Sequence, residues 1–296
     1  MARATLIGFS AVAMWALLAL LTDASGAVPP FLLSAMAFSI GAAAGFAVRL
    51  VVPPPRQAAP VPPAAWVVGI AGLFGYHFFY FTALRNAPAA EASLIAYLWP
   101  LLIVLGSALM PGERLGWHHV AGAVLGLAGS ALIITGGGKL GFDGRYAHGY
   151  AMAAVCALVW SSYSLLSRRF SAVPTHVVAW FCLATAALSL VCHLALEQTV
   201  WPQTAGQWLA VSGLGLMPVG AAFYAWDHGV KHGNIQVLGA ASYGAPLLST
   251  LILVAAGRAE PTATLAAACL LITGGAVLAA KSMLFSGRRA GAAKAR

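Results

Sequence analysis

Charged residues are scarce in this sequence. Only 8% of its 296 residues are Asp, Glu, Lys or Arg, and just seven are acidic. A soluble domain of ordinary composition carries roughly 25% charged residues. So few charges cannot cover a soluble globule, which excludes a soluble enzyme, a nucleic-acid-binding protein and a disordered chain. With 61% hydrophobic residues, the composition indicates an integral membrane protein.

Cysteine is also rare, and nothing in the sequence suggests a metal or cofactor site. The four cysteines all lie in apolar stretches, without CxxC spacing and without a His at ligand spacing. We therefore expect them to be buried thiols. The glycine-rich segment 136–139 lacks the spacing of a phosphate-binding loop, so no ATP-driven engine is predicted. The sequence thus predicts no metal and no cofactor.

Long apolar runs fill most of the chain. A helix that crosses a bilayer needs about 20 largely apolar residues. Ten segments meet this requirement: 5–22, 31–48, 65–84, 92–110, 120–136, 149–167, 175–196, 207–229, 235–256 and 262–283. The connections between them are short and rich in turn residues, which leaves no room for a soluble domain. The predicted fold is an all-α integral membrane protein with ten transmembrane helices.

The basic residues predict the orientation of these helices. Twelve of the sixteen Lys and Arg residues belong to the N-terminus, the even-numbered loops and the C-terminus. Cytoplasmic loops carry the excess of Lys and Arg. We therefore expect both termini in the cytoplasm of a bacterial inner membrane, with residues 286–296 as a basic cytoplasmic tail. The net charge of +9 reflects this topology and does not indicate a nucleic-acid partner.

An internal repeat relates the two halves of the chain. A shift of 145 residues places Trp15 on Trp160, and a shift of 146 places Tyr97 on Tyr243. The shift covers five spans, an odd number, so the second half enters the membrane from the opposite side. We therefore predict two inverted five-helix repeats, in residues 1–138 and 146–285. The first span resembles a cleavable signal peptide, but the repeat needs it as the partner of the sixth.

The order of features in each half resembles the drug/metabolite transporter superfamily, specifically its ten-helix members with two EamA-type repeats. The matching residues are Pro100, Glu113, Gly122 and Gly129 in the first half, and Pro246, Glu260 and Gly275 in the second. The second half departs from the pattern, with Ala268 at the place of Gly122 and one extra residue before Glu260. The resemblance implies a secondary transporter that works by alternating access.

Polar aromatic residues in mid-span are the candidate substrate-binding residues. Their O–H and N–H groups need partners inside a bilayer, so they are better placed around a central cavity than against lipid. Helical spacing and depth select nine residues: His77, Tyr80, Tyr97, Trp99, Trp160, Tyr163, Tyr224, Ser242 and Tyr243. An interhelical hydrogen bond is the alternative role of His77. Pro100 and Pro246 break the backbone ladder of corresponding helices, which predicts a kink or a gating role.

Two sets of charged residues have interpretations that do not involve transport. Asp227 lies one turn before Lys231, so a local ion pair is the alternative to a proton relay. Glu113 and Glu260 precede the last helix of each repeat, where a helix-terminal role is expected. Trp66, Trp117, Trp201 and Trp208 lie near span ends and are expected at the membrane interface.

The predicted function is the export of small amphipathic metabolites, above all amino acids including aromatic ones. The aromatic and His content of the third, fourth and sixth spans resembles that of bacterial aromatic amino-acid exporters. The expected partners are a small-molecule substrate and the lipid bilayer, and one chain holds both repeat orientations, so a monomer would suffice. A coupled ion and the gradient of the substrate remain alternative energy sources. A multidrug or cationic-compound exporter of the same superfamily and an intramembrane enzyme are the alternative functions.

Overall fold

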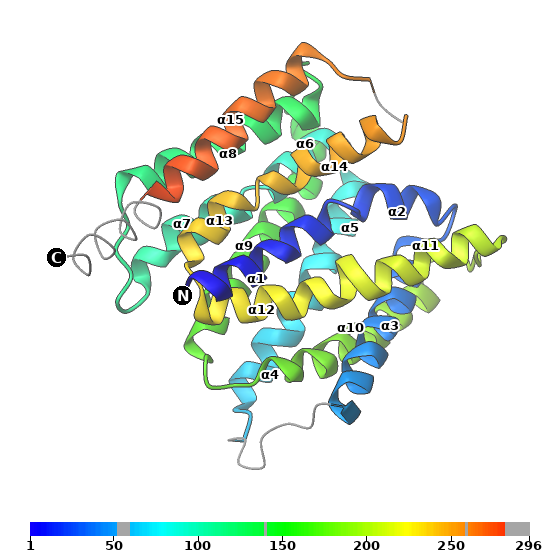
Figure 1. Ribbon diagram of the computed structural model, residues 1–296. Coiled ribbons are helices and arrows are strands. Elements are labelled where there is room, and N and C mark those ends of the chain that lie inside the picture. Colours follow the sequence, from blue (N-terminus) through cyan, green and yellow to red (C-terminus); the bar gives the residue numbers. More distant parts are fainter. Residues whose placement is uncertain (52–59, 139–140, 258–259, 282–296) are drawn as a thin grey trace.

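The computed structural model describes residues 1–51, 60–138, 141–257 and 260–281, and every regular element in these ranges is helical (Figure 1). Some spans are single helices and others are divided. The first five spans are α1 (Ala2–Trp15) with α2 (Leu18–Ala24); α3 (Pro30–Val51); α4 (Pro63–Ile70), η1 (Ala71–Gly75) and α5 (Tyr76–Asn86); α6 (Ala89–Ala96) and α7 (Trp99–Gly106) with η2 (Ser107–Leu109); and α8 (Trp117–Thr135).

The second half repeats this order. Its elements are η3 (Gly144–Tyr146) and α9 (Ala147–Arg169); η4 (Thr175–Val177) and α10 (Val178–Leu196); α11 (Ala205–Leu216), η5 (Met217–Ala221) and α12 (Ala222–His232); α13 (Ile235–Ala241) and α14 (Gly244–Ala255); and α15 (Ala263–Ala279). Nine described spans are long and apolar enough to cross a membrane, and α15 is a shorter apolar helix. The ten-helix prediction is confirmed. The last residues of the tenth predicted span and the tail 286–296 lie outside the described residues.

Matching irregularities relate the two halves of the structure. The π-helical turns η1 and η5 begin 146 residues apart, at Ala71 and Met217. The fourth span is broken between α6 and α7, and the ninth is broken between α13 and α14. Both breaks lie just before a proline, Pro100 and Pro246, whose missing N–H and bulky ring interrupt a helix. The inverted repeat predicted from the sequence therefore recurs in the backbone geometry.

The helices pack in pairs that obey the repeat. The helix α1 of the first half packs against α12 of the second half. In the same way α9, the repeat equivalent of α1, packs against α5, the repeat equivalent of α12. The helices α3 and α10, and likewise α8 and α15, form extensive pairs across the two halves (Figure 1). Small residues permit the closest of these approaches. A Cβ atom at Gly122 would lie 2.4 Å from the carbonyl oxygen of Gly275, so neither position of the α8–α15 pair has room for a side chain.

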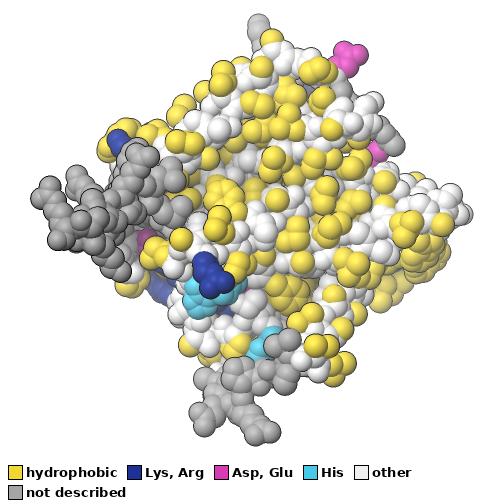
Figure 2. Space-filling model, in the orientation of Figure 1, with side chains coloured by type: hydrophobic (Ala, Val, Ile, Leu, Met, Phe, Trp, Pro, Cys, Tyr) yellow, Lys and Arg dark blue, Asp and Glu magenta, His cyan; other side chains and the backbone are white. Residues whose placement is uncertain are grey.

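The outer surface is largely hydrophobic. Figure 2 shows hydrophobic side chains across the middle of one face, with the visible charged and His side chains nearer its edges. Large apolar residues such as Leu6, Val67, Leu158 and Leu270 are more than half exposed. An apolar belt of this kind suits contact with lipid, because lipid imposes no penalty on exposed apolar side chains. The surface therefore agrees with a multi-pass membrane protein.

Candidate functional site

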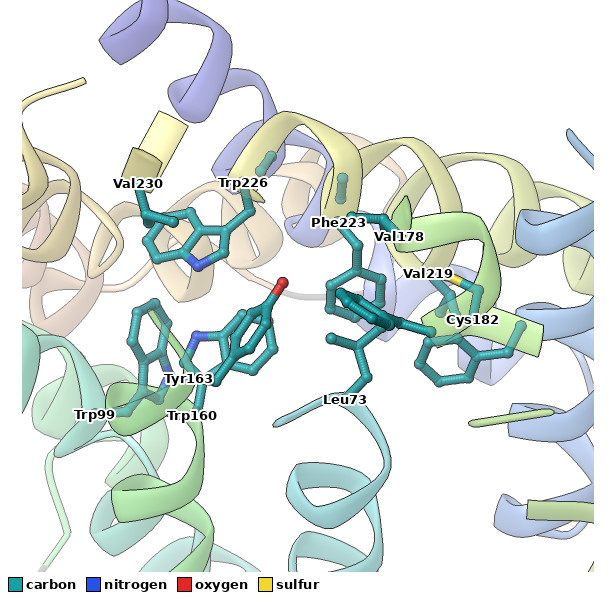
Figure 3. Packing of buried hydrophobic residues seen from close by; sticks show 14 of the residues in the cluster. Leu73, Trp99, Trp160, Tyr163, Val178, Cys182, Val219, Phe223, Trp226 and Val230 are labelled. Carbon is teal, nitrogen blue, oxygen red and sulfur yellow. The ribbon is translucent and has the colours of Figure 1, made fainter. Parts of the chain in front are cut away.

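Five aromatic side chains meet at the centre of the helix bundle. They come from four helices, and their ring centroids lie 5.1–6.3 Å apart in the contacts that join them. We call them the ring cluster: Trp15, Trp99, Trp160, Phe223 and Trp226. Most of these contacts are edge-to-face or tilted, the arrangement that aromatic quadrupoles favour. Figure 3 shows Trp226 and Phe223 on one side and Trp99 and Trp160 on the other.

Four polar ring side chains, which we call the polar rim, extend the ring cluster: Tyr76, His77, Tyr80 and Tyr97. The Tyr76 ring lies 5.3 Å from that of Trp160 and stacks on Tyr80 at 5.9 Å, and the His77 ring lies 6.2 Å from that of Phe223. Tyr97 lies within electrostatic reach of Tyr80. All four are only half-buried, whereas Trp99, Trp160, Phe223 and Trp226 are buried. The polar rim is therefore the more accessible part of the site.

Several polar atoms of the site have no protein partner. Trp15 and Trp226 donate their indole N–H groups to the Pro218 carbonyl oxygen and to Ser164 Oγ, at 3.1 and 3.0 Å. The indole N–H groups of Trp99 and Trp160 have no acceptor among the described residues, and neither nitrogen is sealed from solvent. The same holds for the hydroxyls of Tyr76 and Tyr97. These groups are free to bind a small molecule.

His77 supplies an acceptor to the same region. Its Nδ1 lies 2.8 Å from the Leu73 carbonyl oxygen, to which it donates, so Nε2 is an acceptor when the ring is neutral. The other hydroxyl of the polar rim, on Tyr80, is paired with Ser93 Oγ at 3.2 Å. No member of the ring cluster or the polar rim belongs to an ion pair of the described residues. The site thus combines flat apolar rings with neutral donors and acceptors.

Four of the nine predicted binding residues have other environments. Tyr224 donates its hydroxyl to the Gly41 carbonyl oxygen at 3.2 Å, and Ser242 donates to the Leu238 carbonyl oxygen at 2.7 Å. Tyr243 is fully buried and accepts a 3.2 Å hydrogen bond from the backbone N–H of Leu101, where the helix is broken before Pro100. Tyr163 packs on Trp160, with its hydroxyl buried. The other five belong to the ring cluster or the polar rim.

Four members of the ring cluster and the polar rim were not among the predicted binding residues: Trp15, Tyr76, Phe223 and Trp226. The repeat contains the signal that would have found three of them, because the shift of 145 residues already places Trp15 on Trp160. A shift of 146 residues places Phe223 on His77 and Trp226 on Tyr80. Helical periodicity in the eighth span selected Tyr224 instead, which faces α3.

One end of the bundle is tied together by Arg168. Its guanidinium donates to the carbonyl oxygens of Val230 and Gly233, at 3.0 and 2.9 Å, and forms an ion pair with Glu113. Thr5 Oγ1 accepts from the N–H of Asn234, which brings the start of α1 to the same place. We call this the Arg168 end. Glu113 pairs here with an Arg from the other repeat, rather than stabilising only its own helix as we expected.

The opposite end of the bundle is organised by Glu197. This carboxylate accepts from the backbone N–H groups of Phe31 and Leu32 at the start of α3, and from Arg85 at 2.6 Å and His193 at 3.0 Å. It is 3% exposed, and it joins α3, α5 and α10. We call this the Glu197 end.

The two ends differ in how the divided spans pack. At the Arg168 end, α7 packs against α13, and α9 packs against α12. Their repeat equivalents lie at the Glu197 end. There, α6 packs on α5, α8 and α9, and α14 packs on α1, α2, α8 and α15. Among the described residues, α6 and α14 share no extensive contact with each other. The same is true of α2 and α5. The bundle is therefore closed at the Arg168 end and more loosely packed at the Glu197 end.

Comparison with known proteins gives a consistent family assignment. The EamA-like transporter family matches twice, at residues 2–135 and 147–281. The aromatic amino acid exporter YddG of Ancylobacter novellus is 57% identical over 93% of this chain and 96% of its own length. YddG of Escherichia coli is 24% identical, with 93% of this chain and 96% of its own length covered.

Further relatives extend the comparison. A probable terminal-alkyne amino-acid exporter of Streptantibioticus cattleyicolor is 24% identical over 77% of this chain and 74% of its own length. A crystal structure with 57% sequence identity superposes with a TM-score of 0.89, covering 94% of this chain and 98% of that one.

Proposed function

Because the chain belongs to the EamA-like transporter family of the drug/metabolite transporter superfamily, we propose that it exports amino acids, aromatic ones among them, by alternating access. It is an amino-acid exporter by its similarity to YddG of Ancylobacter novellus and to the other exporters it matches. Its partners are a small-molecule substrate and the bilayer.

The ring cluster and the polar rim carry the proposal for the substrate. Their rings can contact an aromatic side chain edge-to-face, and the ammonium group of an amino acid is attracted to the faces of Trp and Tyr. The free N–H groups of Trp99 and Trp160 suit a carboxylate, whereas His77 Nε2 is an acceptor that suits an ammonium group. A zwitterion with an aromatic side chain matches this set.

The difference between the two ends supports alternating access. Inverted repeats allow one molecule to adopt two conformations in which the repeats exchange their packing. The contacts that α7 makes with α13, and α9 with α12, are then made instead by α6 with α14 and by α2 with α5. In this proposal the described state is the one closed towards the Arg168 end, and the packing of α7 on α13 and of α9 on α12 supports it.

The basic residues support the orientation. Arg168 lies in the last turn of α9, next to an even-numbered loop, so the positive-inside rule assigns the Arg168 end to the cytoplasm and the Glu197 end to the periplasm. The state described here then faces outward from a bacterial inner membrane, with both termini cytoplasmic. Because both repeats belong to one chain, we propose that the monomer is sufficient for transport.

The alternative functions fit the site less well. A site for cationic drugs would be expected to present a carboxylate that is not already neutralised, and the carboxylate beside the ring cluster, Asp227, is paired with Lys231. An intramembrane enzyme would need a nucleophile or a metal centre near the substrate. No group of three or more His, Cys, Asp or Glu side chains that could hold a metal occurs among the described residues.

Uptake into liposomes tests the proposal. Purified protein is reconstituted, and the entry of labelled Trp, Phe, Thr and Met is compared with that into protein-free liposomes. We expect saturable flux of Trp and Phe, lost in the variant Tyr97→Ala, which remains folded in the membrane. Robust flux of a cationic drug without any amino-acid flux would establish the multidrug alternative. Hydrolytic turnover that depends on His77 would establish the enzyme.

A further inference from the structure

A buried ion pair lies directly beside the ring cluster, towards the Arg168 end. Asp227 follows Trp226 in α12, and Lys231 lies one turn further on. Lys231 Nζ is 2.8 Å from Asp227 Oδ2, and the side chains are only 4% and 1% exposed. At a rise of about 1.5 Å per residue, the pair occupies the first 8 Å or so of helix beyond Trp226. These charges are therefore the charged groups of α12 that lie next to the ring cluster on the side of the Arg168 end.

The pair has unused hydrogen-bonding capacity. Asp227 Oδ2 accepts from Lys231 and from Thr175 Oγ1 at 2.7 Å, whereas Oδ1 receives no hydrogen bond from any described residue. Lys231 uses two of its three protons, for Asp227 and for the Val173 carbonyl oxygen at 2.9 Å. Both charged groups could thus accept a further partner without losing each other.

A buried hydroxyl lies near both the ring cluster and this ion pair. Tyr163 is 2% exposed, and its ring lies 5.2 Å from that of Trp160. Its Oη makes no hydrogen bond of normal geometry with a described residue, and the Ser167 side chain lies within its electrostatic reach. In Figure 3 the Tyr163 oxygen points towards the space between Trp226 and Phe223. Asp227 lies within its electrostatic reach. Burying a hydroxyl without a full hydrogen bond destabilises this conformation, and a conformation that supplies a partner relieves that cost.

The energetics of burial argue against a purely structural role. Removing two charges from water is costly, and apolar residues of similar size often stabilise a protein as well as a buried ion pair or better. The two residues are on the same helix, so their mutual attraction does not by itself hold α12 to another element. What connects α12 to its neighbours here are the hydrogen bonds to Val173 and Thr175.

We propose that Asp227, Lys231 and Tyr163 form a second binding site, on the cytoplasmic side of the ring cluster, for the zwitterionic head group of the transported amino acid. This inference rests on the proposed function. When α12 separates from the segment that holds Val173 and Thr175, Asp227 Oδ1 binds the ammonium group. Lys231 and the Tyr163 hydroxyl bind the carboxylate. The ring cluster offers neutral partners only, so the charge pair lowers the cost of moving a zwitterion between the cytoplasm and the centre.

Two variants test the head-group site without leaving a lone buried charge. Asp227→Asn/Lys231→Met removes both charges, and Tyr163→Phe removes the hydroxyl. Flux of labelled L-Phe is measured in proteoliposomes, and equilibrium binding is measured by quenching of tryptophan fluorescence in the purified outward-facing protein. We expect the double variant to lose at least ten-fold in flux while its Kd changes less than two-fold. Tyr163→Phe should lose several-fold in flux and melt at the same or a higher temperature.

The controls separate this site from a structural role and from the central site. Asp143→Asn/Arg145→Met neutralises an exposed pair and should leave both flux and binding unchanged. The exchanged pair Asp227→Lys/Lys231→Asp restores charge balance but not the arrangement, so its flux should stay low. Wild-type flux in the double variant or in Tyr163→Phe, recovery of flux in the exchanged pair, or a parallel loss of binding and flux would overturn the head-group site. Absence of L-Phe flux in the wild-type protein would instead overturn the proposed function.

Discussion

Replacement of Trp160 by Phe should weaken substrate binding while leaving the fold intact. Phe retains much of the apolar contact with Trp15 and Trp99 but removes the free indole N–H. A hydrogen bond to a charged group contributes about 1.5–3 kcal/mol, and each 1.4 kcal/mol is a ten-fold change in affinity. If this N–H donates to the substrate carboxylate, Trp160→Phe should raise the apparent KM for L-Phe by about 10-fold to 100-fold.

Trp226→Phe is the matched control for this prediction. Its indole N–H is already donated to Ser164 Oγ, and the side chain belongs to the same ring cluster. Its loss should lower the melting temperature, because Ser164 loses a partner in a buried position, and should change KM by less than about three-fold, which corresponds to roughly 0.6 kcal/mol. KM is measured by uptake of labelled L-Phe into proteoliposomes, and folding by thermal melting in detergent. An unchanged KM in Trp160→Phe, or an equal rise in Trp226→Phe, would refute the reasoning.

Three further predictions concern stability and the closed end. Gly275→Ala should destabilise the protein by about 1–3 kcal/mol through overpacking, because its Cβ would lie 2.5 Å from the Gly122 carbonyl oxygen. Gly274→Ala, whose Cβ would meet open space, should be neutral or stabilising. Thermal melting in detergent compares the two variants. Glu197→Gln should lower the free energy of unfolding by about 1–3 kcal/mol, because this buried carboxylate joins three helices. Asp143→Asn, in an exposed pair, should lower it by less than about 1 kcal/mol. Equal losses of thermal stability would contradict the structural role of Glu197. Arg168→Met should open the Arg168 end and increase labelling of a cysteine placed at the buried Ser164, while Arg169→Met, at an exposed neighbour, should not.

The architecture was predictable because the length of each apolar segment and the positions of the prolines and aromatic residues are directly visible in the sequence. Ten apolar segments and a repeat near 146 residues were enough to predict the fold. The depth of a residue in its span also placed His77, Tyr80, Tyr97, Trp99 and Trp160 in the region that the structure brings together.

Side-chain direction was harder to predict, because a membrane helix is apolar on every face. In the eighth span the sequence offers Phe223, Tyr224, Trp226 and Asp227 within five positions, and helical spacing between polar residues favoured Tyr224 and Asp227. The structure turns Tyr224 towards α3 and Phe223 and Trp226 towards the ring cluster. The hydrogen bond from Leu101 to Tyr243 depends on a helix break in another span, and no local pattern encodes it.

The two π-helical turns have a consequence for how the repeat is recognised. η1 reads Ala-Gly-Leu-Phe-Gly and η5 reads Met-Pro-Val-Gly-Ala, so no position carries the same residue in both. A π-helical turn is rare and occurs mostly at functional sites. Its presence at the same place in both halves therefore relates two segments that share no residue. A residue-by-residue comparison of the halves would not detect this correspondence.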